Sequence, residues 1–186
     1  MDRHGRQFAR RQGLVQCSES FARDGDLEKL DGGKDKGMIA FSVECLPVAQ
    51  PRQRHRVVTT KGGKTFATNF TPRDDPVNFF KSEIKRAFED WRKIIAPDFK
   101  VLEGPISLYL AFYFPRPAYM LKNKFRQDVD LPKTTVSDLD NLEKSFCDAL
   151  KSLAWRDDAQ ICRKVTSKDW CSSIRKPGVV VKITEI

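Results

Sequence analysis

The sequence predicts an α/β or α+β fold in which a mixed β-sheet carries two main helices. Apolar residues alternate through ISLYLAFYF, residues 106–114, as in a strand with one buried side. Apolar residues recur at helical spacing in residues 77–95 and again in residues 142–153. Three further segments, at residues 38–46, 161–168 and 179–185, predict additional strands.

The N-terminal residues 1–36 are polar, rich in Gly, Asp and Arg, and only weakly periodic. This composition predicts a disordered or marginally helical extension. The first strong strand pattern, MIAFSVECL, starts at Met38, so we expect one folded domain over residues 38–186. Met38 as the natural start of translation is a hypothesis that follows from this boundary.

A hairpin and a capped helix follow the first strand. VVTT-KGGK-TFAT predicts two strands joined by a tight turn, with Gly62 and Gly63 supplying positive φ angles. Asp75 followed by Pro76 is typical of an N-cap and the first helical position. The apolar spacing then predicts an amphipathic helix to about Ile95.

The second half of the chain begins with a break at Gly104-Pro105 before the alternating strand. Residues 115–135 then form a long, polar, basic loop, and loops of this length are usually functional or disordered. The second helix comes next, with Leu142, Phe146 and Leu150 on its apolar side. Two final strands complete the order β, hairpin, α, β, α, β, β.

Composition excludes several protein classes. No apolar run approaches the ~20 residues of a membrane span. The five cysteines are widely spaced without a CxxC pair, and the only histidines are His4 and His55, which disfavours a disulfide framework, a zinc ribbon or a histidine-based catalytic triad. A reduced, cytoplasmic protein is the simplest interpretation.

The net charge of +9 is concentrated in two segments. Residues 50–64 hold five basic residues and no acid, and residues 116–126 hold four basic residues and no acid. Clustered basic residues favour a polyanionic partner, most simply nucleic acid, over a merely solvated surface.

Carboxylates gather at both ends of the second helix. Asp138 and Asp140 precede or open it, and Asp157 and Asp158 follow it. Two helical residues at this spacing lie ~200° apart around the axis, whereas in extended chain they point the same way. The pair therefore shares a face only if the helix starts at or after Asp140.

Two helix registers remain open at this stage. Asp140 can be the N-cap, with Glu143 completing a capping box, or Ser137 can be the cap with Asp140 three residues on. The sequence does not choose between them. Lys144 lies one turn after Asp140, on the same side of the helix.

The two acidic groups cannot meet along the helix, because each turn rises about 5.4 Å. We therefore expect the chain after Trp155 to fold back beside the helix start, or a second subunit to intervene. Clustered carboxylates favour Mg²⁺ or Mn²⁺, and such an ion beside a phosphodiester supports hydrolysis. The plainer interpretation is that one Asp is only a cap, that the DD pair only forms a turn, and that Lys144 pairs with Asp148.

The same stretch holds three motifs in order: DLDNLxK from Asp138 to Lys144, DAL from Asp148, and WxDDAQ from Trp155 to Gln160. With these motifs it resembles the RusA family of Holliday junction resolvases. FSVECLPVAQPRQRHR and NFTPRDD echo the family more loosely. The similarity covers about residues 38–186 and is strong only in 137–161. Here Ser137 stands where relatives often carry Pro, the connection between the helix and the DD pair is one residue shorter than in some relatives, and the 115–135 loop is long.

The resemblance implies a RusA-like fold and a homodimer that cuts four-way DNA junctions symmetrically with Mg²⁺, with Mn²⁺ as a further option. It implies that Asp138, Asp140 and Asp158 are the catalytic metal ligands, with Lys144 as a catalytic cation and Asp157 as an additional acid. It also implies roles in DNA recombination and repair, and many relatives are encoded by phages or prophages. Two sites related by a two-fold axis would suit paired incision.

The rival function is a non-catalytic branched-DNA-binding protein of the same fold, which would keep the basic residues but tolerate loss of the acids. All the acids are present, so we favour the enzyme. The predicted DNA contacts come from the two basic segments: Arg52, Arg54, Arg56, Lys61, Lys64, Arg116, Lys122, Lys124 and Arg126.

Overall fold

A computed structural model describes residues 38–51, 54–70, 72–122 and 125–186, with backbone alone at residues 54–56 and 68–70. The predicted extension over residues 1–36, together with Arg52 and Lys124, lies outside the described residues. Within the described part, no helix is long and apolar enough to cross a membrane.

The main sheet has five strands in the order β1-β7-β4-β6-β5. Strands β4 and β6 are parallel neighbours, and the other pairs are antiparallel. The mixed sheet is therefore confirmed. The strand bounds are β1 Met38–Val43, β4 Ile106–Phe114, β5 Leu131–Pro132, β6 Ile161–Trp170 and β7 Gly178–Glu185.

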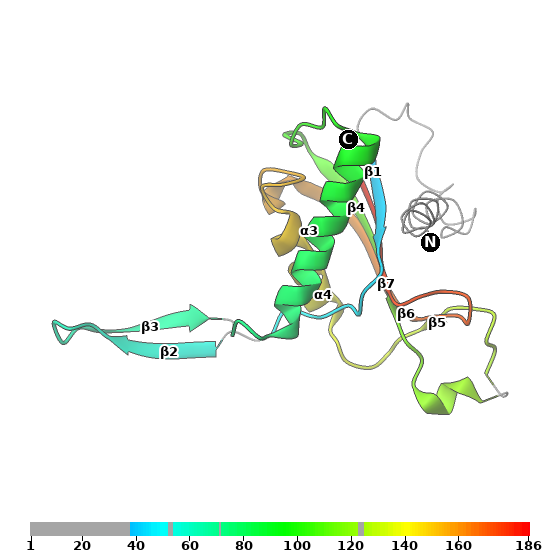
Figure 1. Ribbon diagram of the computed structural model, residues 1–186, viewed down its shortest axis with the longest axis horizontal. Helices are drawn as coiled ribbons and strands as arrows, with labels where there is room; N and C mark the ends of the chain where they lie inside the picture. Colours follow the sequence, from blue (N-terminus) through cyan, green and yellow to red (C-terminus); the bar gives the residue numbers. More distant parts are fainter. Residues whose placement is uncertain (1–37, 52–53, 71, 123–124) are drawn as a thin grey trace, which may run out of the picture.

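A separate hairpin arm consists of β2 (Arg54–Thr59), β3 (Thr65–Phe70) and the turn between them. It forms its own two-stranded sheet and projects away from the helices and the main sheet (Figure 1). The turn uses Gly63 at φ 79°, as predicted, whereas Gly62, for which a positive φ was also expected, does not take one. Lys61 and Lys64 lie at the tip of this arm, both exposed.

Helix α3 runs Pro76–Ile95 and begins as its sequence predicts. The Asp75 side chain accepts a hydrogen bond from the backbone N–H of Val77 at 3.0 Å, which satisfies one of the free donors at the helix start. The predicted helix end at about Ile95 is confirmed, but Ile95 does not join the buried side of the helix, because the residue is 68% exposed. Phe99 turns back instead and packs edge-on against Phe88 and Trp91.

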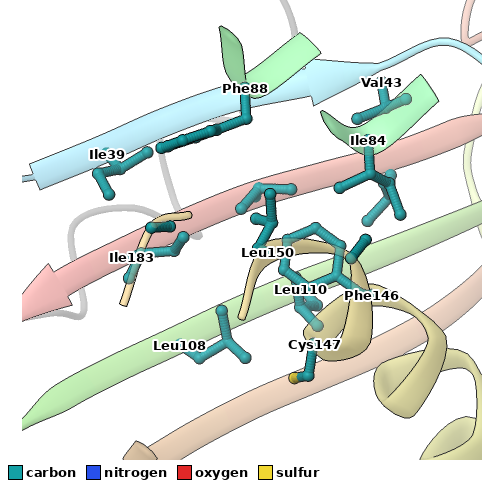
Figure 2. Packing of buried hydrophobic residues seen from close by; sticks show 14 of the residues in the cluster. Ile39, Val43, Ile84, Phe88, Leu108, Leu110, Phe146, Cys147, Leu150 and Ile183 are labelled. Atoms are coloured by element: carbon teal, nitrogen blue, oxygen red, sulfur yellow. The ribbon is translucent and has the colours of Figure 1, made fainter. Parts of the chain in front are cut away.

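Helix α4 runs Leu139–Leu150 and connects β4 to its parallel neighbour β6. Leu142, Phe146 and Leu150 are fully buried, at the helical spacing that predicted them. They pack with side chains of α3 and of strands β1, β4 and β7 in one continuous core (Figure 2). Two short 3-10 turns complete the fold, η1 at Ala118–Leu121 and η2 at Asp158–Gln160.

Strand β4 lies in the middle of this core. Its alternate residues face the helices and are buried, as the alternation predicted: Ile106, Leu108, Leu110, Phe112 and Phe114. The strand has β7 on one side and β6 on the other. This central position holds the two ends of α4 in fixed places relative to the sheet.

Gly178 makes a close approach that tests this packing. A Cβ at this position would lie 2.1 Å from the carbonyl oxygen of Val43, a contact with backbone that cannot move aside cheaply. We expect Gly178→Ala to lower the free energy of unfolding by about 1–3 kcal/mol, measured by urea denaturation. Gly62→Ala is the control, because nothing lies within 4 Å of its added methyl. Equal stability of the two variants would contradict the packing described.

Candidate functional site

The start of α4 follows neither of the two registers that the sequence left open. Asp138 is the N-cap, with extended backbone at φ −71° and ψ 141°, and the helix begins at Leu139. Asp140 lies in the first turn. Because Asp138 is outside the helix, the ~200° separation of two helical residues does not apply to this pair.

Both carboxylates at this end are exposed. Asp138 makes no side-chain cap hydrogen bond. Among the residues that the structure describes, neither Asp138 nor Asp140 forms a side-chain hydrogen bond or an ion pair. Their oxygen atoms are therefore available to a ligand, and carboxylate oxygens suit a hard divalent cation.

Glu143 does not complete the predicted capping box. Its side chain turns to strand β6, where it pairs with the Lys164 ammonium and accepts a hydrogen bond from Thr166 Oγ1 at 3.2 Å. The helix register points Glu143 at the neighbouring strand, where a largely buried carboxylate needs partners. The hydrogen bond that the Lys164 ammonium donates to Glu143 raises the pKa of Lys164, and the nearby charge of Asp140 adds to this shift.

Lys144 lies one turn after Asp140 and is exposed. The sequence offered Asp148 as its partner, but Asp148 pairs with Lys81 of α3, whose ammonium lies 2.9 Å from Asp148 Oδ2. Within the described ranges, Lys144 forms no ion pair. Its charge remains available beside the two aspartates.

Asp157 and Asp158 lie at the opposite end of α4. Asp158 Oδ1 accepts a hydrogen bond at 2.9 Å from the indole N–H of Trp155, which is fully buried. Asp157 caps η2 by accepting from the backbone N–H of Ala159 at 3.0 Å. Lys151 lies 2.6 Å from Asp157 Oδ2 and 4.0 Å from Asp158 Oδ2, and its hydrogen bond lowers the pKa of Asp157.

The expected return of Asp158 to the helix start is wrong within one copy of the chain. The 12 residues of α4 span about 18 Å, and Lys151, directly after the helix, holds Asp157 and Asp158 at that end. Strand β6 starts at Ile161, directly after η2, and runs back along α4 from that end. The described residues accordingly contain no group of three or more metal-ligating side chains.

Cys147 lies on α4 between the two acidic groups, and it is not suited to bind a metal ion. Burial raises the pKa of its thiol to about 12, with smaller contributions from the charges of Asp158 and Glu143. A thiol binds metal as thiolate. The oxygen donors at the start of α4 are therefore the better ligands in this region.

Arg116 was expected to contact DNA, but its guanidinium binds the backbone of its own loop and of the strand end nearby. Its guanidinium donates to the carbonyl oxygens of Cys171 and Arg126, both at 2.6 Å, and to that of Val129. Gln127 adds hydrogen bonds to the carbonyls of Met120 and Phe125, both at 2.9 Å. The segment around η1 is therefore folded around polar side chains.

The other predicted DNA contacts lie on projecting parts of the molecule. Lys122 and Arg126 are exposed on the loop, and Arg126 pairs with Asp128 at 2.8 Å. Arg54 and Arg56 lie two residues apart in β2, opposite Phe70 and Thr68 of β3. The hairpin arm and the loop leave the body of the molecule in different directions (Figure 1).

The sequence did not predict a role for two lysines near Asp138. Lys133 and Lys168 donate to backbone carbonyls in residues 135–137, directly before Asp138. Neither lysine belongs to a charge cluster, and Lys168 is distant from Asp138 in the sequence. Lys168 alternates with Lys164 and Thr166 along β6, and this spacing could have indicated that all three side chains face α4.

Comparison with known proteins agrees with this architecture. The sequence profile of the family described as Endodeoxyribonuclease RusA matches residues 45–184. The chain is also similar to YqaN, an uncharacterized protein of Bacillus subtilis (strain 168), with 28% identity over 155 residues. That alignment covers 80% of this chain and 96% of YqaN. The profile match starts two residues after β1, ends one residue before the end of β7 and includes both ends of α4. The chain therefore belongs to the RusA family of endodeoxyribonucleases.

Proposed function

We propose that this protein is a divalent-metal-dependent endonuclease that resolves four-way DNA junctions as a homodimer. The observation that carries the proposal is the pair of unpartnered carboxylates, Asp138 and Asp140, with Lys144 one turn along α4. Membership of an endodeoxyribonuclease family supports it.

In this proposal Asp138 and Asp140 hold Mg²⁺, or Mn²⁺ in its place. The bound ion supplies Lewis-acid chemistry at a phosphodiester. Lys144 places its ammonium where negative charge develops on the phosphate, and a fixed cation stabilises that charge more in the transition state than in the ground state. The described donors fit this role because both acids are oxygen ligands without competing partners.

We propose that Asp158, together with Asp157, contributes to the metal site of the other subunit in a dimer. One copy keeps the two acidic groups at opposite ends of α4, so an Asp158 that contributes to cleavage reaches the metal only across the dimer. A two-fold dimer would build two equivalent composite sites, and paired incision of a symmetric junction needs two sites.

The basic residues on the projecting parts are proposed to bind the DNA arms: Arg54, Arg56, Lys61, Lys64, Lys122 and Arg126. Arg52 and Lys124, which neighbour them in the sequence, are included in the proposal. Salt-dependent phosphate contacts of this kind give affinity without sequence preference. They would draw a polyanion toward a locally acidic site.

Cleavage assays with a synthetic four-way junction, a flap and a linear duplex, each with and without Mg²⁺, test the proposal. We expect Mg²⁺-dependent, paired cleavage of the junction. Asp138→Asn and Asp140→Asn should each lower the cleavage rate by roughly 100-fold or more, because the partners that merely orient metal ligands already contribute 10–100-fold. Junction binding should persist or improve, since a repulsive charge is lost.

Asp98→Asn, at an exposed acid between α3 and β4, is the matched control and should cleave normally. Full cleavage by Asp138→Asn would refute the site. Tight junction binding without cleavage by the wild-type protein, with either Mg²⁺ or Mn²⁺, would favour the non-catalytic DNA-binding function instead.

Subunit mixing tests the role of Asp158. We expect Asp138→Asn and Asp158→Asn to be inactive as separate homodimers. After the two are unfolded and refolded together, the heterodimer should regain nicking activity at one site, because one composite site keeps both native acids. A mixture as inactive as its components would show that Asp158 acts within its own subunit or only supports Trp155.

Salt dependence of DNA binding tests the hairpin arm. We expect the double variant Lys61→Gln, Lys64→Gln to bind junction DNA more weakly at low salt. The slope of log K against log[salt] is negative, and its magnitude should decrease by about 2, close to 0.9 for each lost phosphate contact. The control pair Lys93→Gln, Lys100→Gln removes two exposed lysines away from the arm, so its slope should remain that of the wild type. An unchanged slope in the arm variant would exclude contact by these lysines.

A further inference from the structure

The segment that leads into Asp138 has no regular secondary structure, yet its backbone is held firmly. Lys133 Nζ donates to Thr135 O and Thr135 Oγ1, each at 3.0 Å, and to Val136 O. Lys168 Nζ donates to Thr135 O at 2.9 Å and to Ser137 O at 2.6 Å. Two ammonium groups thus bind the carbonyls of three successive residues.

The position of Lys133 is unusual for a lysine. Its residue is 5% exposed, and its ammonium lies 4.7 Å from the ring centre of Phe114 and 4.9 Å from that of Trp170. Burial, with the nearby charge of Lys168, lowers the pKa of Lys133. Burying a charged group is costly unless it is paired or hydrogen-bonded, and here three N–H donors meet three acceptors.

The sheet supplies both lysines. Lys133 directly follows β5, and its backbone N–H donates to Lys168 O at 3.0 Å. Lys168 belongs to β6, which pairs with β4 in the centre of the sheet. The rigid part of the molecule therefore reaches the residues before α4 through these two side chains.

We propose that Lys133 and Lys168 are positioning residues for Asp138 and Asp140. By binding the carbonyls of residues 135–137, they fix the direction in which the chain enters α4 and so set the spacing of the two carboxylates. This inference rests on the proposed metal-dependent function. It extends that function by assigning the support of the metal ligands to two cations that touch neither metal nor DNA.

Loss of the lysine's charge and loss of its support for the metal ligands change metal affinity in opposite directions. A lysine near a cation site repels the cation, so removal of its charge alone would strengthen metal binding. Removal of the support of a metal ligand typically weakens binding by 10–100-fold. The direction of the change therefore separates the two effects.

The test measures Mn²⁺ binding to the full chain, without DNA, by calorimetry. We expect Lys168→Met to raise the Kd for Mn²⁺ about tenfold. Lys168→Arg, which keeps donors at the same place, should restore most of the affinity. Asp138→Asn should abolish binding, and the control Lys100→Met, at an exposed lysine distant in sequence, should bind as the wild type does.

A second measurement separates turnover from DNA affinity. In Lys168→Met the single-turnover cleavage rate should fall about tenfold at saturating Mg²⁺ and DNA, while the Kd for the junction changes less than twofold. A loss confined to junction affinity would mean that Lys168 is a DNA contact and would overturn the inference. Thermal unfolding confirms that the variant is folded, and Lys168 is used for this reason rather than the more buried Lys133.

The outcomes distinguish this inference from the proposed function. Equal or tighter Mn²⁺ binding by a folded Lys168→Met overturns the positioning role, even if the wild type cleaves junctions. Mn²⁺ binding that weakens in Lys168→Met, with a wild type that cuts no DNA, keeps the positioning role and refutes the nuclease. A wild type that binds no Mn²⁺ overturns both.

Discussion

The burial of one side of α4 against the sheet and α3 is the constraint on which the candidate site depends. Leu142, Phe146 and Leu150 are fully enclosed, and burial of each such side chain contributes about 1.5–3 kcal/mol. Neither end of α4 can shift without opening that core. The acids before and after the helix therefore keep their separation, and the geometry of the site follows from packing more than from the electrostatics of the acids themselves.

Local signals predicted most of the fold. The Asp75 cap, the alternation in β4 and the glycine turn of the hairpin arm each act within a few residues, and each appears where the sequence placed it. The exposed Ile95 is the exception. Phe99 rather than Ile95 packs against the end of α3, and this depends on where the chain turns after the helix.

The candidate site was predicted less completely because its decisive contacts are long-range. Whether Glu143 caps α4 or pairs with Lys164 depends on a strand 21 residues away. The distance of Asp158 from Asp140 depends on the direction of β6, which no local pattern reveals. The number of basic residues in a segment also does not show which of them are free to contact DNA. Arg116, for example, donates its hydrogen bonds to backbone carbonyls of this chain.

The positive charge of this chain accordingly divides into two kinds. Arg116, Lys133 and Lys168 serve the backbone of this chain, where they replace water as donors to carbonyls in loops without ladder partners. Lys61, Lys64 and Lys122 stay exposed on the projecting parts. Part of the net charge of +9 therefore belongs to side chains whose donors are already used by the backbone of this chain.

The hairpin arm has a dynamic consequence. Val57 and Phe66 are 67% and 52% exposed, and the two strands of the arm pair only with each other in the sheet. A two-stranded ribbon without a packed layer beneath it has little stability of its own. The amides of its described outer part, residues 57–67, should therefore exchange with solvent far faster than those of β4 and β7, through local opening that leaves the core intact. The arm can change shape around a partner at almost no cost to the stability of the body that carries it.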